Sequence, residues 1–167
     1  MAELDPISLE IISNALRSVT DETYAALMKS AYSTNIKERH DHSTAIMDAR
    51  GRLIVQAVES LPIHIASMNG LMECLLEKFG SDISQGDIFV ANDPHSAGGT
   101  HLPDINLATP VYLAGELQGF VCNIAHHADV GGMAPGSMAG GMSEIYQEGL
   151  RIPVIRLFKK GELQQDI

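Results

Sequence analysis

The feature that most constrains the fold is a pair of apolar runs, residues 107–112 and 119–124, separated by a short turn at residues 114–116. Two such runs around a glycine-containing turn predict an antiparallel β-hairpin. The outer ends of the two strands in a hairpin lie side by side. The segments that precede and follow this hairpin are therefore expected to meet, although they are far apart in sequence.

Those two outer segments carry side chains that bind metal ions. His101 and Asp104 precede the first run, and His126 follows the second. Imidazole and carboxylate are the donors that borderline and hard divalent cations prefer. Pro103 stiffens the backbone between the first two donors, so they can converge with little loss of entropy. We predict that His101, Asp104 and His126 hold one divalent metal ion with a position open for chemistry. Zinc is the first expectation, with manganese or iron as alternatives.

Asp41 is a candidate fourth ligand. It lies just before another hairpin signal, the apolar runs 45–47 and 53–55 around a turn that contains Gly51. A side chain at the outer end of that hairpin could point into the same site. The alternative interpretation is a salt bridge with Arg39 or a turn cap, and the residues alone do not separate the two.

The residues that follow His126 are candidates for catalysis. Neighbouring side chains on extended backbone point to opposite faces, so His127 cannot easily join His126 at the metal. We predict catalytic roles for His127 and Asp129, by contact with substrate or by proton transfer. The alternative is that either residue orients the metal ligands by hydrogen bonding to them without binding the ion itself. His64 stands before a predicted helix and is interpreted as a capping or packing residue rather than a ligand.

The rest of the chain predicts an α+β fold in which two helices pack on antiparallel β-hairpins with long site-bearing loops. Asp5-Pro6 is a strong helix start, and apolar residues at helical spacing predict a helix over 7–30. A second helix is predicted from residue 65 to Phe79, ended by Gly80. The other expected elements are strands at 87–91 and 152–158, irregular structure at 32–41, a glycine-rich loop at 131–141 and a helical turn at 143–149.

Length and composition narrow the range of possible functions and partners. The 167 residues suit a single domain, 1–167. A net charge of −10 argues against nucleic acid and anionic membrane surfaces as partners. No apolar run approaches the roughly 20 residues of a membrane helix, and residues 1–5 lack the apolar segment of a secretory signal, so a cytoplasmic location is expected. Cys74 and Cys122 lie in apolar segments and are interpreted as buried thiols.

Several motifs together resemble the hydantoinase B family. They are Asn92-Asp93-Pro94, Gly98-Gly99-Thr100-His101-Leu102-Pro103-Asp104-Ile105, Ala125-His126-His127-Ala128-Asp129-Val130-Gly131-Gly132 and the segments 36–39, 41–43 and 144–153. That family includes the B subunits of ATP-dependent N-methylhydantoinases, the C-terminal part of 5-oxoprolinase, caprolactamase-type lactamases and the α subunits of acetone carboxylase. The resemblance covers nearly all of this chain but only the N-terminal portion of a family chain. His42 and His95 depart from the family pattern, which suggests an extra histidine near the site.

The resemblance implies a metal site at the positions of Asp41, His101, Asp104 and His126. It also implies two partners: the remainder of the B chain, and a hydantoinase A-type subunit that binds ATP and phosphorylates the oxygen of a small cyclic amide or ketone. This chain itself would bind no ATP. In the hydrolase branch of the family, the metal would activate water to open a cyclic amide ring.

The sequence is also compatible with two other functions. In the carboxylase branch of the family, the metal would hold an enolate or phosphoenol facing carbon dioxide or bicarbonate. A third interpretation, from a different class, is a non-catalytic assembly fragment that has kept the fold. Metal content separates the third interpretation from the first two, and substrate tests separate the first two from each other.

Overall fold

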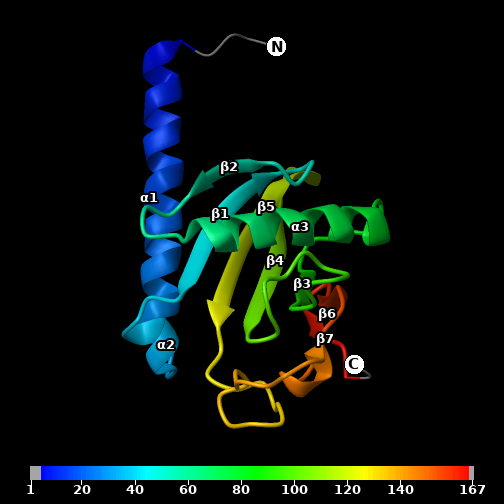
Figure 1. The fold of residues 1–167 in the computed structure, drawn as a ribbon. Helices are drawn as coiled ribbons and strands as arrows, with labels where there is room; N and C mark the ends of the chain where they lie inside the picture. The colour runs from blue at the N-terminus through cyan, green and yellow to red at the C-terminus, as the bar shows by residue number, and fades with distance from the viewer. Residues whose placement is uncertain (1–4, 166–167) are drawn as a thin grey trace.

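A computed structural model describes residues 5–165, which form one seven-stranded antiparallel sheet of order β2-β1-β5-β4-β3-β6-β7 (Figure 1). The elements are α1 (Pro6–Ser30), α2 (Thr34–Lys37), β1 (His42–Asp48), β2 (Leu53–Gln56), α3 (Pro62–Phe79), β3 (Ile88–Ala91), β4 (Asp104–Leu113), β5 (Glu116–His126), η1 (Ile145–Gln147), β6 (Ile155–Lys159) and β7 (Glu162–Leu163). The expected α+β class, with helices on antiparallel hairpins, is confirmed. Residues 1–4, which carried most of the inference about a secretory signal, lie outside the described residues, as do 166 and 167.

Helix α3 crosses one face of the sheet and forms the main core with it (Figure 1). The apolar residues of α3 that recur every three or four positions are fully buried against strand residues that point to the same face. These buried residues are Met68, Leu71, Met72 and Leu75 from the helix, and Ala45, Met47, Phe89, Phe120 and Ile124 from the sheet. Burial of this apolar surface is the largest favourable term in folding.

Helix α1 packs on the opposite face of β1. The Thr44 hydroxyl donates to the Thr20 carbonyl oxygen (3.0 Å), and the Tyr24 ring stacks on His42 at 3.9 Å between centroids. The N-terminal half of α1 extends past the strands (Figure 1), and its apolar side chains there are exposed, including Ile7 and Ile11. The helix was therefore predicted correctly, but only its later turns contribute to the core.

The central hairpin β4–β5 is confirmed and is longer than predicted. Its turn contains only Ala114 and Gly115, both with positive φ (52° and 83°), the conformation that matches the twist of paired strands. Pairing continues to the outer ends of the strands, where Asp104 is directly opposite His126. The expected meeting of the two outer segments is therefore part of the sheet register itself.

Three local predictions were wrong. The segment 32–41 contains the short helix α2. Helix α3 begins at Pro62, the position where a missing N–H costs nothing, so His64 lies inside its first turn rather than before it. The last long strand begins at Ile155 rather than at residue 152. The reason is that the Ile152 N–H donates to the Asn92 side-chain oxygen rather than to a neighbouring strand.

Cys74 and Cys122 are free thiols; Cys122 is fully buried, which raises its pKa to about 12, whereas Cys74 is only partly buried. Within residues 5–165, no helix is both long and apolar enough to cross a membrane.

The packing of α1 on β1 predicts acid sensitivity through His42. Its ring is fully buried, Nε2 donates to the Tyr24 carbonyl oxygen (3.2 Å), and Nδ1 has no hydrogen-bond partner among the described residues. Burial lowers the pKa of His42. The stability that neutral His42 contributes is therefore fully present above the unfolded pKa of about 6.5 and is lost as the pH falls below it.

Urea unfolding at about pH 7.5 and about pH 5.5 measures this loss, with His42→Phe as the comparison. Phenylalanine keeps a ring against Tyr24 but cannot be protonated. We expect the variant to be less stable at the higher pH, because it lacks the bond to the Tyr24 carbonyl, and to lose less stability on acidification than the unmodified chain. Equal losses in both proteins would contradict the assignment.

Candidate metal site

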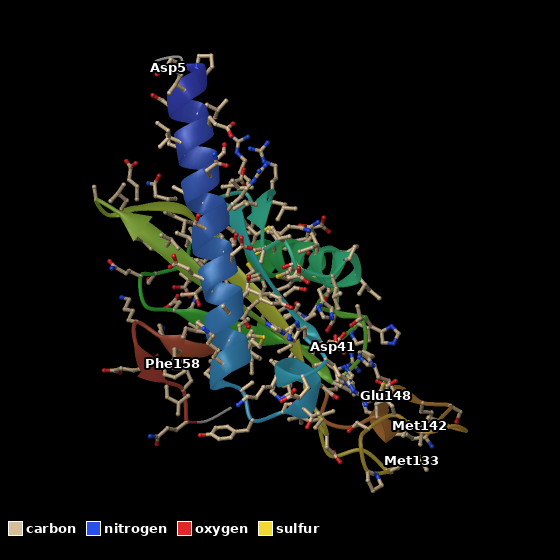
Figure 2. All side chains as sticks on the ribbon, turned by 90° about the vertical axis from the view of Figure 1, so that its left-hand side faces the viewer. Asp5, Asp41, Met133, Met142, Glu148 and Phe158 are labelled. Carbon is tan, nitrogen blue, oxygen red and sulfur yellow. The ribbon has the colours of Figure 1, made fainter. Side chains whose placement is uncertain are left out.

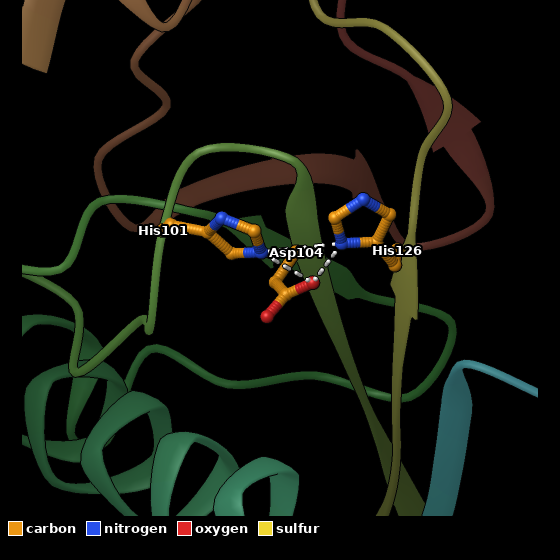
Figure 3. A group of neighbouring side chains, drawn as sticks. All are labelled: His101, Asp104 and His126. Carbon is orange, nitrogen blue, oxygen red and sulfur yellow. Dashed lines mark hydrogen bonds and ion pairs between the residues drawn. The ribbon is translucent and has the colours of Figure 1, made fainter. Parts of the chain in front are cut away.

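Three side chains meet where strands β4 and β5 end (Figure 3). His101 Nε2 lies 3.1 Å from Asp104 Oδ1, His126 Nδ1 lies 3.0 Å from the same oxygen, and the two ring nitrogens are 3.2 Å apart. We call these three atoms the donor triangle. Asp104 and His126 are almost fully buried, and His101 is partly exposed. The structure thus brings together the three residues that the sequence grouped first.

The backbone explains why the donor triangle forms. Asp104 and His126 are opposite each other in the β4–β5 register, so their side chains share one face of the sheet. His101 lies on the turn just before β4, where its carbonyl oxygen accepts the Asp104 N–H (3.1 Å). The Pro103 carbonyl oxygen accepts the His127 N–H (2.8 Å), which extends the strand pairing past the site.

Hydrogen bonds keep the Asp104 carboxylate ionised. Burial alone would raise its pKa, but hydrogen bonds from His101 and Thr100 outweigh burial and lower the pKa to about 2. The Thr100 hydroxyl donates to Oδ2, which leaves Oδ1 for the donor triangle. The hydrogen bond with Asp104 raises the pKa of His101. Below that pKa, a proton competes with any cation for His101.

The donor triangle has the dimensions of a metal site. Ligand atoms around a tetrahedral zinc ion, at bond lengths of about 2.0–2.1 Å, are about 3.3 Å apart. The three separations here are 3.0–3.2 Å. Two imidazoles and one carboxylate are also the donor types that zinc, manganese and iron accept. The residues therefore fit the divalent cation that the sequence predicts.

Asp41 borders the donor triangle. One carboxylate oxygen lies 3.9 Å from His126 Nδ1, and the other lies 3.5 Å from His64 Nε2. The Asp41 carbonyl oxygen accepts the His126 N–H (3.0 Å), which fixes the two backbones side by side. In Figure 2, Asp41 lies toward the end of the molecule opposite Asp5. A role as fourth ligand remains a prediction, and the described contacts of its carboxylate are with histidines rather than Arg39.

His127 and Asp129 lie outside this cluster. The His127 side chain is exposed, as expected for the neighbour of an inward-facing strand residue. The Asp129 carboxylate accepts the N–H groups of Gly131 (2.7 Å) and Gly136 (3.0 Å), which lower its pKa and order the glycine-rich loop. Catalytic roles for both residues remain predictions.

His64 is the site residue that the sequence interpretation missed. It is 2% exposed, and its Nε2 lies 3.5 Å from Asp41 Oδ1 and 3.8 Å from Asp104 Oδ2. The two histidines that depart from the family pattern lie in different places: His42 faces α1, whereas His95 borders a cavity beside His101. Only His95 therefore matches the expected extra histidine at the site.

A cavity of about 380 Å³ adjoins the donor triangle. Such a volume is typical of a small-molecule site. Its lining includes His95, Thr100 and His101 on one side and Glu144, Ile145 and Glu148 on the other. Glu148 accepts the Leu102 N–H (3.2 Å), which ties the two walls together. The predicted helical turn at 143–149, observed as η1, thus forms one wall of a cavity beside the candidate metal site.

A close contact between α3 and the site loop gives a testable prediction. A Cβ atom added at Gly70 would lie 2.6 Å from the Cα of Gly98, too close for the present backbone. Gly70→Ala should therefore displace the loop that carries His101, while alanine strengthens the helix itself. We expect cation affinity to fall about tenfold or more with helix content unchanged, whereas exposed Glu73→Ala leaves affinity intact. Isothermal titration calorimetry measures the cation affinity, and equal affinities of Gly70→Ala and the unmodified protein would contradict the prediction.

The comparisons with known proteins agree with the fold and with the motifs. Residues 5–167 match the family model described as hydantoinase B/oxoprolinase. The chain is 39% identical over 98% of its length to 5-oxoprolinase of Dictyostelium discoideum, and 34% identical over its whole length to caprolactamase subunit beta of Pseudomonas jessenii. The nucleotide-free structure of acetone carboxylase superposes with a TM-score of 0.88 at 25% identity over 97% of this chain. This chain belongs to the hydantoinase B/oxoprolinase family.

The match covers only part of each relative. The chain spans 13% of the 5-oxoprolinase, 28% of the caprolactamase subunit and 21% of the acetone carboxylase chain. The relatives thus contain much more polypeptide than the residues described here. The activity, substrates and partners of a whole enzyme are therefore matters for proposal, as is the division of residues 1–167 into one domain.

Proposed function

We propose that this chain is the metal-binding part of the B subunit of an ATP-dependent amidohydrolase of the hydantoinase or oxoprolinase type. The observation that carries the proposal is the donor triangle of His101, Asp104 and His126 beside a cavity of small-molecule size. The family membership and the likeness to caprolactamase subunit beta support the reaction class. Localisation in the cytoplasm remains an expectation from the sequence.

The residues of the site have distinct tasks in this proposal. His101, His126 and Asp104 hold the cation, with Asp41 as the fourth ligand, and Thr100 fixes the orientation of the Asp104 carboxylate. A bound divalent cation would supply a Lewis acid and would lower the pKa of a water molecule used to attack an activated carbonyl carbon. The cavity lined by His95 and Glu148 holds the cyclic amide. His127 and Asp129 remain the proposed groups for proton transfer.

Partners complete the proposed enzyme. A hydantoinase A-type subunit binds ATP and activates the amide oxygen by phosphorylation, and the remainder of the B chain encloses the substrate. The name of the beta subunit of caprolactamase supports an assembly of more than one subunit. A zinc ion is the proposed cofactor of this chain, with manganese or iron as alternatives.

A second candidate, the carboxylase subunit, is favoured by the superposition with acetone carboxylase. One experiment separates the two. The complete B subunit is combined with its A-type partner, ATP and either a cyclic amide or a ketone with bicarbonate. Ring opening without incorporation of labelled bicarbonate supports the amidohydrolase. Ketone carboxylation without ring opening supports the carboxylase, and a metal-free protein inactive in both assays supports the assembly fragment.

A further inference from the structure

The structure places His64 between a buried hydroxyl and two carboxylates. The ring lies in the first turn of α3, with Nδ1 2.9 Å from Ser43 Oγ on strand β1. Its opposite nitrogen, Nε2, faces Asp41 (3.5 Å) and Asp104 (3.8 Å). Ser43 is fully buried and His64 is 2% exposed. Each ring nitrogen therefore has a defined neighbour, and the position of the proton on the ring can be derived.

The Ser43 hydroxyl determines that position. Ser43 Oγ accepts the backbone N–H of Leu61 (2.8 Å), so one lone pair is used. A hydroxyl has one proton to donate. Among the contacts of the described residues, the remaining partner of Ser43 Oγ is His64 Nδ1. If Nδ1 carried the proton, the buried hydroxyl would have no acceptor, which is unfavourable. Ser43 therefore donates to Nδ1, and the ring proton is on Nε2.

This tautomer defines what His64 can do at the site. With its proton on Nε2, the neutral ring presents an N–H to the two carboxylates and offers no lone pair to a cation. The distances of 3.5 and 3.8 Å place that N–H between Asp41 and Asp104 without a short bond to either. Two carboxylates near each other repel, and the N–H dipole between them offsets part of that repulsion.

We propose that His64 is a positioning residue: held by Ser43 with its proton on Nε2, it keeps the Asp41 and Asp104 carboxylates turned toward a cation at His101, Asp104 and His126. The proposal rests on the proposed metal-binding function. It extends that function by assigning His64 to the support of the ligands rather than to the ligand set. Partners of this kind orient ligating groups and contribute strongly to metal affinity.

Nitrogen-15 spectra of the histidine side chains test the tautomer directly. Long-range proton–nitrogen correlations of the metal-free protein should show His64 Nδ1 as a hydrogen-bond acceptor and Nε2 as protonated, and zinc should leave this pattern unchanged. Proton on Nδ1, or a metal-shifted unprotonated Nε2 after zinc is added, overturns the proposal. This readout needs no variant and no activity.

Zinc affinity tests the positioning role. It is measured by competition with a chromophoric chelator. His64→Leu should weaken zinc binding about 10–100-fold. His64→Gln, whose amide nitrogen occupies the place of Nε2 and can still donate, should stay within about threefold of the unmodified protein. Ser43→Ala, which frees the tautomer, should fall between the two. Equal losses in the Leu and Gln variants indicate a packing role and overturn the proposal, as does unchanged affinity in the Leu variant.

Failure of the proposed function gives a different result. If the unmodified protein binds no zinc at the donor triangle, the metal-binding function falls, and so does the positioning role. The spectra then still decide whether Ser43 sets the His64 tautomer. If the unmodified protein binds zinc tightly and the His64 variants do not differ, only the positioning role is overturned.

Discussion

Replacement of Asp104 with asparagine should reduce the affinity of this protein for a divalent cation by more than about 100-fold, beyond the range typical of residues that only orient a ligand. Asparagine has nearly the same shape but lacks the negative charge. Asp104 is the residue whose oxygen contacts both ring nitrogens of the donor triangle. Its pKa is lowered to about 2, so the carboxylate is ionised at neutral pH. A neutral amide oxygen is a weaker donor to a divalent cation than a carboxylate.

Controls separate loss of the site from loss of charge or fold. Glu22→Gln changes the net charge by the same amount at an exposed position on α1 and should leave cation affinity unchanged. Far-ultraviolet circular dichroism checks that the Asp104→Asn variant is folded. If the folded variant binds zinc as tightly as the unmodified protein, Asp104 is not a ligand.

Asn92→Ala should lower the free energy of unfolding by about 3 kcal/mol. The Asn92 amide is fully buried and makes three hydrogen bonds: Nδ2 donates to the carbonyl oxygens of Leu102 (2.7 Å) and Leu150 (2.8 Å), and Oδ1 accepts the Ile152 N–H (2.6 Å). These bonds connect the loop of His101 to residues 150–152, which directly follow the segment that forms the other wall of the cavity. Alanine leaves all three backbone groups without these partners, and a buried unsatisfied group costs about 1–3 kcal/mol.

Urea denaturation measures this effect against a matched asparagine. Asn14→Ala on α1 removes an exposed side chain bonded to Glu10 (3.0 Å) and should cost less than about 0.5 kcal/mol. A similar, small loss in both variants would show that the Asn92 bonds do not hold the two segments together. We also expect weaker zinc binding in Asn92→Ala, because the backbone at Leu102 is next to His101.

Local patterns in the sequence were sufficient to predict the hairpin and the donor triangle. Residues 107–112 and 119–124 are apolar runs on either side of a glycine-containing turn, and strand pairing then requires Asp104 and His126 to meet. The helix over 7–30 was equally clear. The sequence does not indicate which face of this helix is covered, because that depends on where β1 lies in space. In the structure, only Thr20 and Tyr24 of this helix are buried.

The role of His64 depends on contacts that are distant in sequence. Its partners Ser43 and Asp41 lie on or beside β1, more than twenty residues earlier. One signal was nevertheless present. With Pro62 as the first helical residue, His64 falls in phase with Met68 and Leu71, three to four residues apart, and so lies on the buried face of α3. A buried histidine at the end of such a face needs polar partners, and the candidate site supplies them.

The Asn92 contacts could not be predicted in the same way. Its three bonding partners, Leu102, Leu150 and Ile152, are defined only by how two loops approach each other. Loops obey no periodic pattern, so their packing follows from the whole fold. The cavity beside His101 could not be predicted for the same reason, because Glu148, which helps to close it, lies 46 residues beyond its bonding partner Leu102.

Anomalous diffraction from crystals grown with zinc tests the central claim most directly. We expect one strong peak about 2.0–2.2 Å from His101 Nε2, His126 Nδ1 and an oxygen of Asp104. The three atoms already lie within 4.8 Å of one another, so only small side-chain movements are needed. A peak elsewhere, with the three side chains still hydrogen-bonded to one another, would contradict the account.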